Sequence, residues 1–251
     1  MARNVLVTGA SGGIGRAIAA RFAADGDAVV ITGRDAGRLR RAADELGAHG
    51  VVCDAADPAQ VAGLRAQLGD RVDVLVNNAG GNTDFEYDGT SDGESDSADG
   101  CRADLERLAA SWRANLDANL ISAVLTTNAV ADLLAAGGSV ISIGTIGAER
   151  GGGSYGAAKA ALASWNVYLS AEIGPRGVTA NVISAGYIAG TNFFRDKLTS
   201  QRRETLIAAT HDKRPGRPDD IAETAYFLAS PGARHITGQS IHVNGGAFTT
   251  R

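Results

Sequence analysis

Short apolar runs alternate with longer amphipathic segments along the chain, and this alternation predicts the fold. Runs rich in Val, Ile and Leu, with the length of buried strands, occupy 4–8, 28–32, 50–54, 72–76, 138–145, 178–183 and 241–243. Segments with helical periodicity occupy 16–22, 35–46, 58–68, 104–136, 154–173, 193–210 and 219–229. A repeating strand–helix–strand order favours parallel strands joined by crossover helices. We therefore predict an α/β fold of the Rossmann type, in which a doubly wound, parallel, seven-stranded sheet carries helices on both faces.

Two stretches depart from this pattern within what we predict to be a single domain spanning 1–251. The first, near 81–103, is an insertion rich in Gly, Ser and Asp that lacks helical periodicity. Its acidic residues are Asp84, Glu86, Asp88, Asp92, Glu94, Asp96 and Asp99. We interpret it as a solvated loop, which its place after the fourth strand also brings near the expected ligand crevice. The second stretch, near 190–214, is predicted to form a lid.

A glycine-rich turn, TGASGGIG at 8–15, joins the first strand to the first helix. Glycines let the backbone turn tightly and approach a pyrophosphate closely, and the following helix offers free N–H groups and the positive end of its dipole. This context predicts a dinucleotide site, although the glycine spacing is not GxGxxG. The alternative is a turn that binds no ligand. The candidate cofactor contacts in the turn are Gly9, Ser11, Gly13, Ile14 and Gly15.

The end of the second strand distinguishes NADP from NAD. An acidic residue there would bind the ribose 2′-hydroxyl of NAD. This chain has Gly33 followed by Arg34, whose guanidinium can pair in a bidentate way with the 2′-phosphate of NADP. We therefore favour NADP(H), with NAD(H) as second choice if Asp35 is the missing acid rather than a helix N-cap. Asp54, at the end of the third strand, is placed to accept a hydrogen bond from the adenine amino group.

Tyr155 and Lys159 are four residues apart in a predicted helix, which places both on one helical face. An unperturbed Tyr has a pKa of about 10, and a nearby positive charge lowers it. A Tyr tuned in this way can give a proton to a carbonyl oxygen or take one from an alcohol. The same spacing also arises by chance, so its meaning depends on the glycine-rich turn. Together the two features predict a nicotinamide-dependent enzyme.

Composition and charge narrow the class of protein. The chain is 44% hydrophobic and 21% charged, which is typical of a soluble globular protein. Its net charge of -4 gives no general electrostatic reason to bind nucleic acid or an anionic membrane. Cys53 and Cys101 make no disulfide framework, and no cysteine or histidine cluster indicates a metal site. We see neither a secretory leader nor an apolar stretch long enough to span a membrane, and we expect a cytoplasmic protein.

Three motifs, in order, resemble the signatures of the short-chain dehydrogenase/reductase superfamily: TGASGGIG at 8–15, NNAG at 77–80 and YGAAK at 155–159. The segments GRPDDIA at 216–222 and VNGG at 243–246 resemble the family's C-terminal end, so the resemblance covers nearly the whole chain. Within the family the chain is similar to members of ordinary length that resemble 3-oxoacyl-ACP reductase. The resemblance implies further cofactor contacts at Asn78, Ala79, Gly80, Ile188 and Thr191, and also at Tyr155 and Lys159.

The same resemblance implies a catalytic set of Tyr155, Lys159, Thr145 and Asn119. In relatives a Ser just past the fifth strand binds the substrate carbonyl. Here we favour Thr145 for that role over Ser142, which falls inside the strand. Relatives also have an Asn that helps to hold a water near the active-site Lys. We favour Asn119 over Asn115, because the apolar run after Asn119 matches the family better.

The implied reaction is hydride transfer between NADP(H) and a carbonyl or secondary alcohol, and we favour a ketone reductase acting on a small molecule. Phe193 and Phe194 either line an apolar substrate pocket or pack the lid onto the protein's own core. Relatives associate into tetramers or dimers, so a homo-oligomer is expected. The alternatives are a cofactor-binding regulator without turnover, and an epimerase or dehydratase on the same fold.

Overall fold

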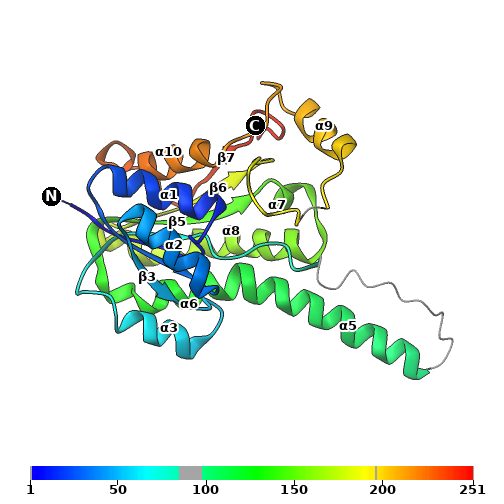
Figure 1. Cartoon of the computed structure of the whole chain (residues 1–251), viewed down its shortest axis with the longest axis horizontal. Helices are drawn as coiled ribbons and strands as arrows, with labels where there is room; N and C mark the ends of the chain where they lie inside the picture. Colours follow the sequence, from blue (N-terminus) through cyan, green and yellow to red (C-terminus); the bar gives the residue numbers. More distant parts are fainter. Residues whose placement is uncertain (1, 85–97, 196, 251) are drawn as a thin grey trace.

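The computed structural model describes residues 2–84, 98–195 and 197–250, so the acidic residues from Glu86 to Asp96 lie outside the described part of the chain. The described strands form one parallel, seven-stranded sheet in the order β3-β2-β1-β4-β5-β6-β7 (Figure 1). The strands are β1 Asn4–Val7, β2 Ala28–Gly33, β3 His49–Val52, β4 Val72–Asn77, β5 Leu134–Thr145, β6 Thr179–Ala185 and β7 Ser240–Val243. The predicted fold class is confirmed.

The strand order reverses beside β1, with β2 on one side and β4 on the other. In doubly wound sheets such a switch point opens a crevice outside the C-terminal ends of the strands, because the two flanking connections diverge to opposite faces. The glycine-rich turn follows β1 and the NNAG segment follows β4. The fold therefore brings these two motifs to the same edge of the sheet.

Helices cover both faces of the sheet (Figure 1). Buried side chains of α1, α2 and α10 form one apolar cluster with the sheet, and those of α3 and α8 form a second cluster. The described helices are α1 Gly13–Ala24, α2 Ala36–Leu46, α3 Pro58–Arg65, α5 Ala98–Leu116, α6 Ser122–Ala129, α7 Gly147–Arg150, α8 Gly153–Ile173, α9 Ser200–Ala208 and α10 Pro218–Leu228. A π-helical segment, Asp117–Ile121, joins α5 to α6.

The continuous apolar runs of the strands follow from burial on both faces. Val5 and Val7 of β1 belong to the first cluster, whereas Leu6 between them belongs to the second. Successive side chains of a strand point to opposite faces, so a strand covered on both sides needs apolar residues at every position. Burying such a side chain fully contributes about 1.5–3 kcal/mol, and these two clusters supply the main stabilisation of the sheet.

The predicted helix over 104–136 has the wrong boundaries. It begins earlier, at Ala98, and α6 ends at Ala129, while β5 starts at Leu134 rather than at 138. An Ala- and Leu-rich run fits a helix or a buried strand equally well from its pattern alone. The pairing of Leu134 with Val72 of β4 selects the strand.

The lid predicted over 193–210 is helical only in α9, Ser200–Ala208. The residues before it, 190–195, form turns. Gly190 has a φ of +72° and Arg195 a φ of +47°, and this left-handed backbone conformation does not continue into a helix.

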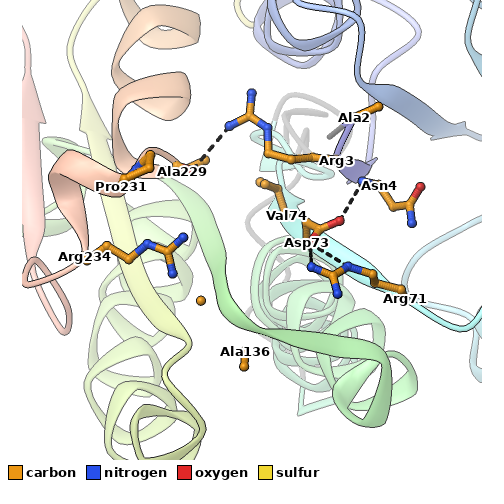
Figure 2. A pocket seen from close by; sticks show the side chains of 11 residues that line it. Ala2, Arg3, Asn4, Arg71, Asp73, Val74, Ala136, Ala229, Pro231 and Arg234 are labelled. Carbon is orange, nitrogen blue, oxygen red and sulfur yellow. Dashed lines mark hydrogen bonds and ion pairs between the residues drawn. The ribbon is translucent and has the colours of Figure 1, made fainter.

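Arg3 lies at the opposite end of the strands, where they begin, and its side chain joins separate segments of the chain. Its guanidinium donates to the Asp27 carboxylate through Nε and Nη2 and to the carbonyl of Ala229 through Nη1. Figure 2 shows Arg3 beside a cavity of about 420 Å³, which Arg71 and Asp73 also line. The Asp27 side chain is 4% exposed, so the ion pair it makes with Arg3 is poorly screened by water.

Replacing Arg3 by Ala is therefore expected to lower the free energy of unfolding by about 2 kcal/mol, because the nearly buried Asp27 carboxylate loses its partner. Chemical denaturation followed by circular dichroism measures this change. Arg71→Ala is the matched control, since Arg71 pairs with Asp73 while its own side chain is 58% exposed. Its loss should be clearly smaller. Equal losses in the two variants would contradict the prediction.

Candidate active site

A cavity of about 480 Å³ opens at the C-terminal ends of the strands, beside the switch point. Six of the predicted cofactor residues line it: Gly9, Ser11, Arg34, Asp54, Ala79 and Gly80. They come from the turn after β1, from the ends of β2 and β3, and from the loop after β4. Their convergence follows from the parallel strand order, which collects the C-terminal ends of these strands at one edge.

The glycine-rich turn packs directly on the NNAG segment. Gly9 has a φ of +65°, and a Cβ there would stand 2.8 Å from the Cα of Ala79. A Cβ on Gly15 would stand 2.3 Å from Nδ2 of Asn78. Asn78 Nδ2 donates to the carbonyls of Thr8 and Gly9 at 3.0 and 2.9 Å. The side chain of Asn78 thus fixes the shape of the turn, and the glycines are required by this close approach.

The N-terminus of α1 is open in the way that a pyrophosphate site requires. Its N-cap is Gly12, so no side chain caps the helix, and a Cβ on Gly12 would have no described atom within 4 Å. Gly13, with a φ of +55°, faces the methyl of Thr191. Ile14 packs on the first apolar cluster. The first N–H groups of α1 are therefore left without a capping side chain, and a helix start of this kind favours an anion.

Two arginines stand at the ribose end of the cavity. Arg34 is 76% exposed, and its Nη1 lies 4.0 Å from Asp54 Oδ2. Asp35 is the N-cap of α2: its Oδ1 accepts from the backbone N–H of Arg38 at 2.8 Å, and this bond holds the pKa of Asp35 below its usual value. Arg38, in the first turn of α2, also lines the cavity, and its Nε donates to Asp35 Oδ2 at 3.1 Å. Our sequence analysis missed Arg38, although its spacing of four residues from Arg34 was visible.

Thr145 and Tyr155 meet at the C-terminal end of β5. The hydroxyl of Thr145 lies close enough to the phenol of Tyr155 to favour its ionised form and so lower its pKa, and it accepts from the backbone N–H of Gly147 at 3.2 Å. Ser142 lies inside β5, fully buried, and its Oγ has no hydrogen-bond partner among the described residues. Of the two candidate hydroxyls, the structure brings Thr145 to Tyr155 and leaves Ser142 in the sheet.

Lys159 is buried beneath Tyr155, and its Nζ donates to the carbonyl of Ile143 at 2.8 Å. Burial lowers the pKa of this ammonium to about 8, because charge is disfavoured away from water. Burial raises the pKa of Tyr155 well above its ordinary value, and the nearby Thr145 hydroxyl offsets only part of this. We expected Lys159 to lower the pKa of Tyr155. Burial is the larger effect in this arrangement, and the Lys159 ammonium is directed to the carbonyl of Ile143 in β5.

Asn119 and Asn115 are both buried and in contact with each other. Asn119 lies in the π-helical segment, and its amide exchanges two hydrogen bonds with the backbone of Gly81, at 2.9 and 3.0 Å. Its Nδ2 also donates to the carbonyl of Asn115 at 3.0 Å. A Cβ on Gly80 would stand 2.5 Å from Asn119 Oδ1. Asn119 therefore fixes the loop after β4, and π-helical turns of this kind are frequent at functional sites.

Ile188 and Thr191 follow β6. The side chain of Ile188 is buried in the first apolar cluster. Thr191 Oγ1 donates to the carbonyl of Ile188 at 3.1 Å, so this hydroxyl is engaged locally. The methyl of Thr191 nevertheless lies close to Gly13 of the glycine turn, which places this segment beside the predicted nicotinamide end of the crevice.

Other classes of site find little support in the described residues. No cluster of three or more His, Cys, Asp or Glu side chains that could hold a metal ion occurs within 2–84, 98–195 and 197–250. None of the described helices is long and apolar enough to cross a membrane.

The glycine turn lies where the strand order of the parallel sheet reverses, and a nearby helix carries Tyr155 and Lys159. These features define a dinucleotide-binding α/β protein. Comparison with known proteins agrees. A family model described as Enoyl-(Acyl carrier protein) reductase matches residues 9–248. The chain is 35% identical over 254 residues to the 3-oxoacyl-[acyl-carrier-protein] reductase of Escherichia coli, covering 97% of this chain and 96% of that one.

Solved structures give the same answer. A short-chain dehydrogenase from Burkholderia cenocepacia in complex with NADP is 30% identical, with a TM-score of 0.80 over 98% of this chain and 97% of that one. A blue fluorescent protein from a metagenomic library, in complex with NADPH, is 31% identical with a TM-score of 0.81 and 98% coverage of both chains. The chain belongs to the short-chain dehydrogenase/reductase family, which confirms the resemblance in its motifs.

Proposed function

We propose that this protein is an NADP(H)-dependent oxidoreductase that reduces a ketone to a secondary alcohol. The observation that carries the proposal is the placement of the Thr145 hydroxyl next to the Tyr155 phenol, with Lys159 buried one helical turn after Tyr155, at the same sheet edge as the glycine turn. A regulator without turnover would have no need for this arrangement. An epimerase or dehydratase on the same fold remains the alternative reaction class.

Each residue of the site has a role in this reaction. The nicotinamide, when bound, supplies a hydride to the carbonyl carbon. Thr145 donates a hydrogen bond to the carbonyl oxygen, which accumulates negative charge as the hydride arrives. Tyr155 delivers its proton to the same oxygen. Lys159 supplies the positive charge beside the phenolate that forms, and Asn119 fixes the loop through which the site reaches solvent.

The charge at the ribose end supports NADP(H) over NAD(H). Asp35, the candidate acid for NAD, is already engaged at both oxygens: Oδ1 caps α2 at the N–H of Arg38, and Oδ2 accepts from Arg38 Nε at 3.1 Å. Arg34 and Arg38 line the cavity and offer two guanidinium groups to a 2′-phosphate. The two solved relatives described above hold NADP and NADPH.

The lid supports a substrate with an apolar group next to its carbonyl. Phe193 stacks against Tyr155, Phe194 lies 5.0 Å from Phe193, and Tyr187 lies 6.0 Å from Phe194, measured between ring centres. This row of rings forms an apolar wall beside the proton donor. Our sequence analysis gave lining of a pocket and packing of the lid as alternatives, and the contact with Tyr155 favours the pocket.

A screen tests the proposed function. Purified protein is mixed with NADPH and a panel of ketones and aldehydes that carry apolar, polar or charged groups, and NADPH oxidation is followed by absorbance. We expect turnover with ketones that carry apolar groups. NADPH that binds but is oxidised by no carbonyl compound would contradict the proposal.

The reductive turnover number should fall as pH rises through about 8. Lys159 carries its proton below its pKa of about 8, and above it the charge that stabilises the Tyr155 phenolate is lost. Steady-state rates at saturating NADPH, measured from pH 6 to about 10, test this. Lys159→Arg is the diagnostic variant, because a guanidinium keeps its charge throughout this range. Its residual activity should lack the fall, and an unchanged fall would assign it to another group.

We also propose that the protein is a homo-oligomer, a tetramer or dimer. Large apolar side chains are exposed along α5 and α8, namely Leu105, Leu108, Trp112, Val167 and Tyr168. Figure 1 shows the N-terminal half of α5 projecting from the body of the protein. An apolar face of this kind is typical of an interface. A cytoplasmic location stays a prediction.

A further inference from the structure

The helix that carries Tyr155 begins without a cap. Gly151, Gly152 and Gly153 precede or open α8, with φ values of +78°, -168° and +58°. The N-cap, Gly152, offers no side chain to the free N–H groups. Tyr155 stands in this first turn, so its position rests on a stretch of backbone with unusual conformational freedom. Some other group must hold the start of α8 if the phenol is to stay beside Thr145.

Asp84, the first acidic residue of the loop after β4, reaches this helix start. Its Oδ1 accepts from the hydroxyl of Ser154, the residue immediately before Tyr155. Its Oδ2 lies 3.8 Å from where a Cβ on Gly153 would stand. A carboxylate at this place also interacts favourably with the positive end of the α8 dipole. Asp84 thus holds the first turn of α8 from a distant part of the chain, through the Ser154 hydroxyl.

The same oxygen of Asp84 holds α5. It accepts from Asn115 Nδ2 at 2.8 Å and from the Ser111 hydroxyl at 3.2 Å. Asn115 Nδ2 also donates to Ser154 Oγ at 2.8 Å, which closes a ring of bonds among Asp84, Asn115 and Ser154. Ser154 is 4% exposed and Asn115 is fully buried, so these bonds are shielded from water.

The orientation of Asn115 in turn fixes Asn119. With Nδ2 directed to Asp84 and Ser154, Asn115 Oδ1 faces the other way and accepts from the backbone N–H of Thr83 at 3.2 Å. Asn119 Nδ2 lies 3.4 Å from the same oxygen and bonds to the carbonyl of Asn115. Asp84 has acceptors only, and it therefore sets the direction of every donor in this network.

We propose that Asp84 is a positioning residue of the active site, which holds Tyr155 through Ser154 and Asn119 through Asn115. This inference rests on the proposed function of Tyr155. Of the acidic residues within 81–97, Asp84 alone lies in the described part of the chain, and this inference assigns it a role.

Asp84→Ala should lower the turnover number for ketone reduction by about 10²-fold, because a small displacement of a catalytic group has effects of this size. The KM for the ketone and the affinity for NADPH should change little, since Asp84 is not among the residues that line the cofactor cavity. Asp84→Asn should recover most of the loss, because its amide oxygen still accepts hydrogen bonds. Asp99→Ala, at an exposed carboxylate in the first turn of α5, is the control and should match the unaltered protein.

Amide hydrogen exchange provides a readout that needs no turnover. In Asp84→Ala the amides of 156–158, the first that are hydrogen-bonded within α8, should exchange faster, while those of β1 and β4 stay as protected as in the unaltered protein. Unchanged exchange at 156–158, or an unchanged turnover number, would overturn the inference. A fall in turnover number that Asp84→Asn does not recover would also overturn the inference. The same holds for a fall that comes with weaker NADPH binding and faster amide exchange throughout the protein. If the unaltered protein reduces no ketone, the proposed function fails, and the exchange result still decides whether Asp84 holds α8.

Discussion

Replacing Tyr155 by Phe is expected to lower the turnover number by about 10³-fold, within the range that general acid catalysis contributes, while NADPH binding is retained. The change removes one oxygen atom and keeps the ring that packs against Phe193. The carbonyl oxygen then lacks its proton donor, and Thr145 loses the neighbouring phenol. Steady-state kinetics with the best ketone of the screen, together with a fluorescence titration of NADPH, separate chemistry from binding.

Tyr168→Phe is the matched control for this experiment. Tyr168 lies on the same helix, is 65% exposed, and undergoes the same chemical change at a distance from the site. Its turnover number should equal that of the unaltered protein. Substantial residual turnover in Tyr155→Phe would mean that another group, or water, protonates the carbonyl oxygen, and the assigned role of Tyr155 would then be wrong.

The second large effect is expected at the ribose end of the cavity. Removing both guanidinium groups, in Arg34→Ala with Arg38→Ala, should weaken NADPH binding by about 10- to 10²-fold, because each charge-assisted hydrogen bond contributes about 1.5–3 kcal/mol before screening by water. NADH has no 2′-phosphate, so its affinity should change little. Fluorescence titration with each cofactor measures the two dissociation constants.

Arg40→Ala provides the control for charge. Arg40 is exposed on α2, the helix that carries Arg38, but it does not line the cavity. A general loss of positive charge would weaken NADPH binding equally in all the arginine variants, whereas a 2′-phosphate contact affects Arg34 and Arg38 alone. If NADH binds more tightly than NADPH to the unaltered protein, the preference for NADP(H) is wrong.

Most of the fold could be predicted from the sequence because burial on both faces leaves a strong pattern. Val5, Leu6 and Val7 face two different clusters, and a short run of apolar residues bounded by a glycine turn has few other interpretations. The glycines were also informative, since a Cβ on Gly9 or Gly15 would collide with the NNAG segment. At Leu134 the pattern fits a helix or a buried strand, and only the pairing with β4 decides between them.

The site was less predictable, because its geometry depends on contacts between distant parts of the chain. Asp84 and Ser154 are 70 residues apart, and nothing in an acidic, Gly-rich segment indicates that its first carboxylate reaches the active-site helix. The pKa of Tyr155 likewise depends on its burial, to which distant residues such as Phe193 contribute, and the Lys159 ammonium donates to the carbonyl of Ile143. The spacing of four residues places Tyr155 and Lys159 on one face of α8. It does not by itself bring the phenol oxygen and the ammonium nitrogen into contact.

The central claim is that this site moves a hydride from NADPH to a ketone. The most direct test is to supply NADPH that carries deuterium at both hydrogen positions of nicotinamide C4 with a ketone that is turned over, and to examine the alcohol by mass spectrometry and NMR. We predict an alcohol with one deuterium on the carbinol carbon, formed by the unaltered protein and lost in Tyr155→Phe. An alcohol without deuterium, or NADPH that stays unoxidised beside every ketone, would contradict the account.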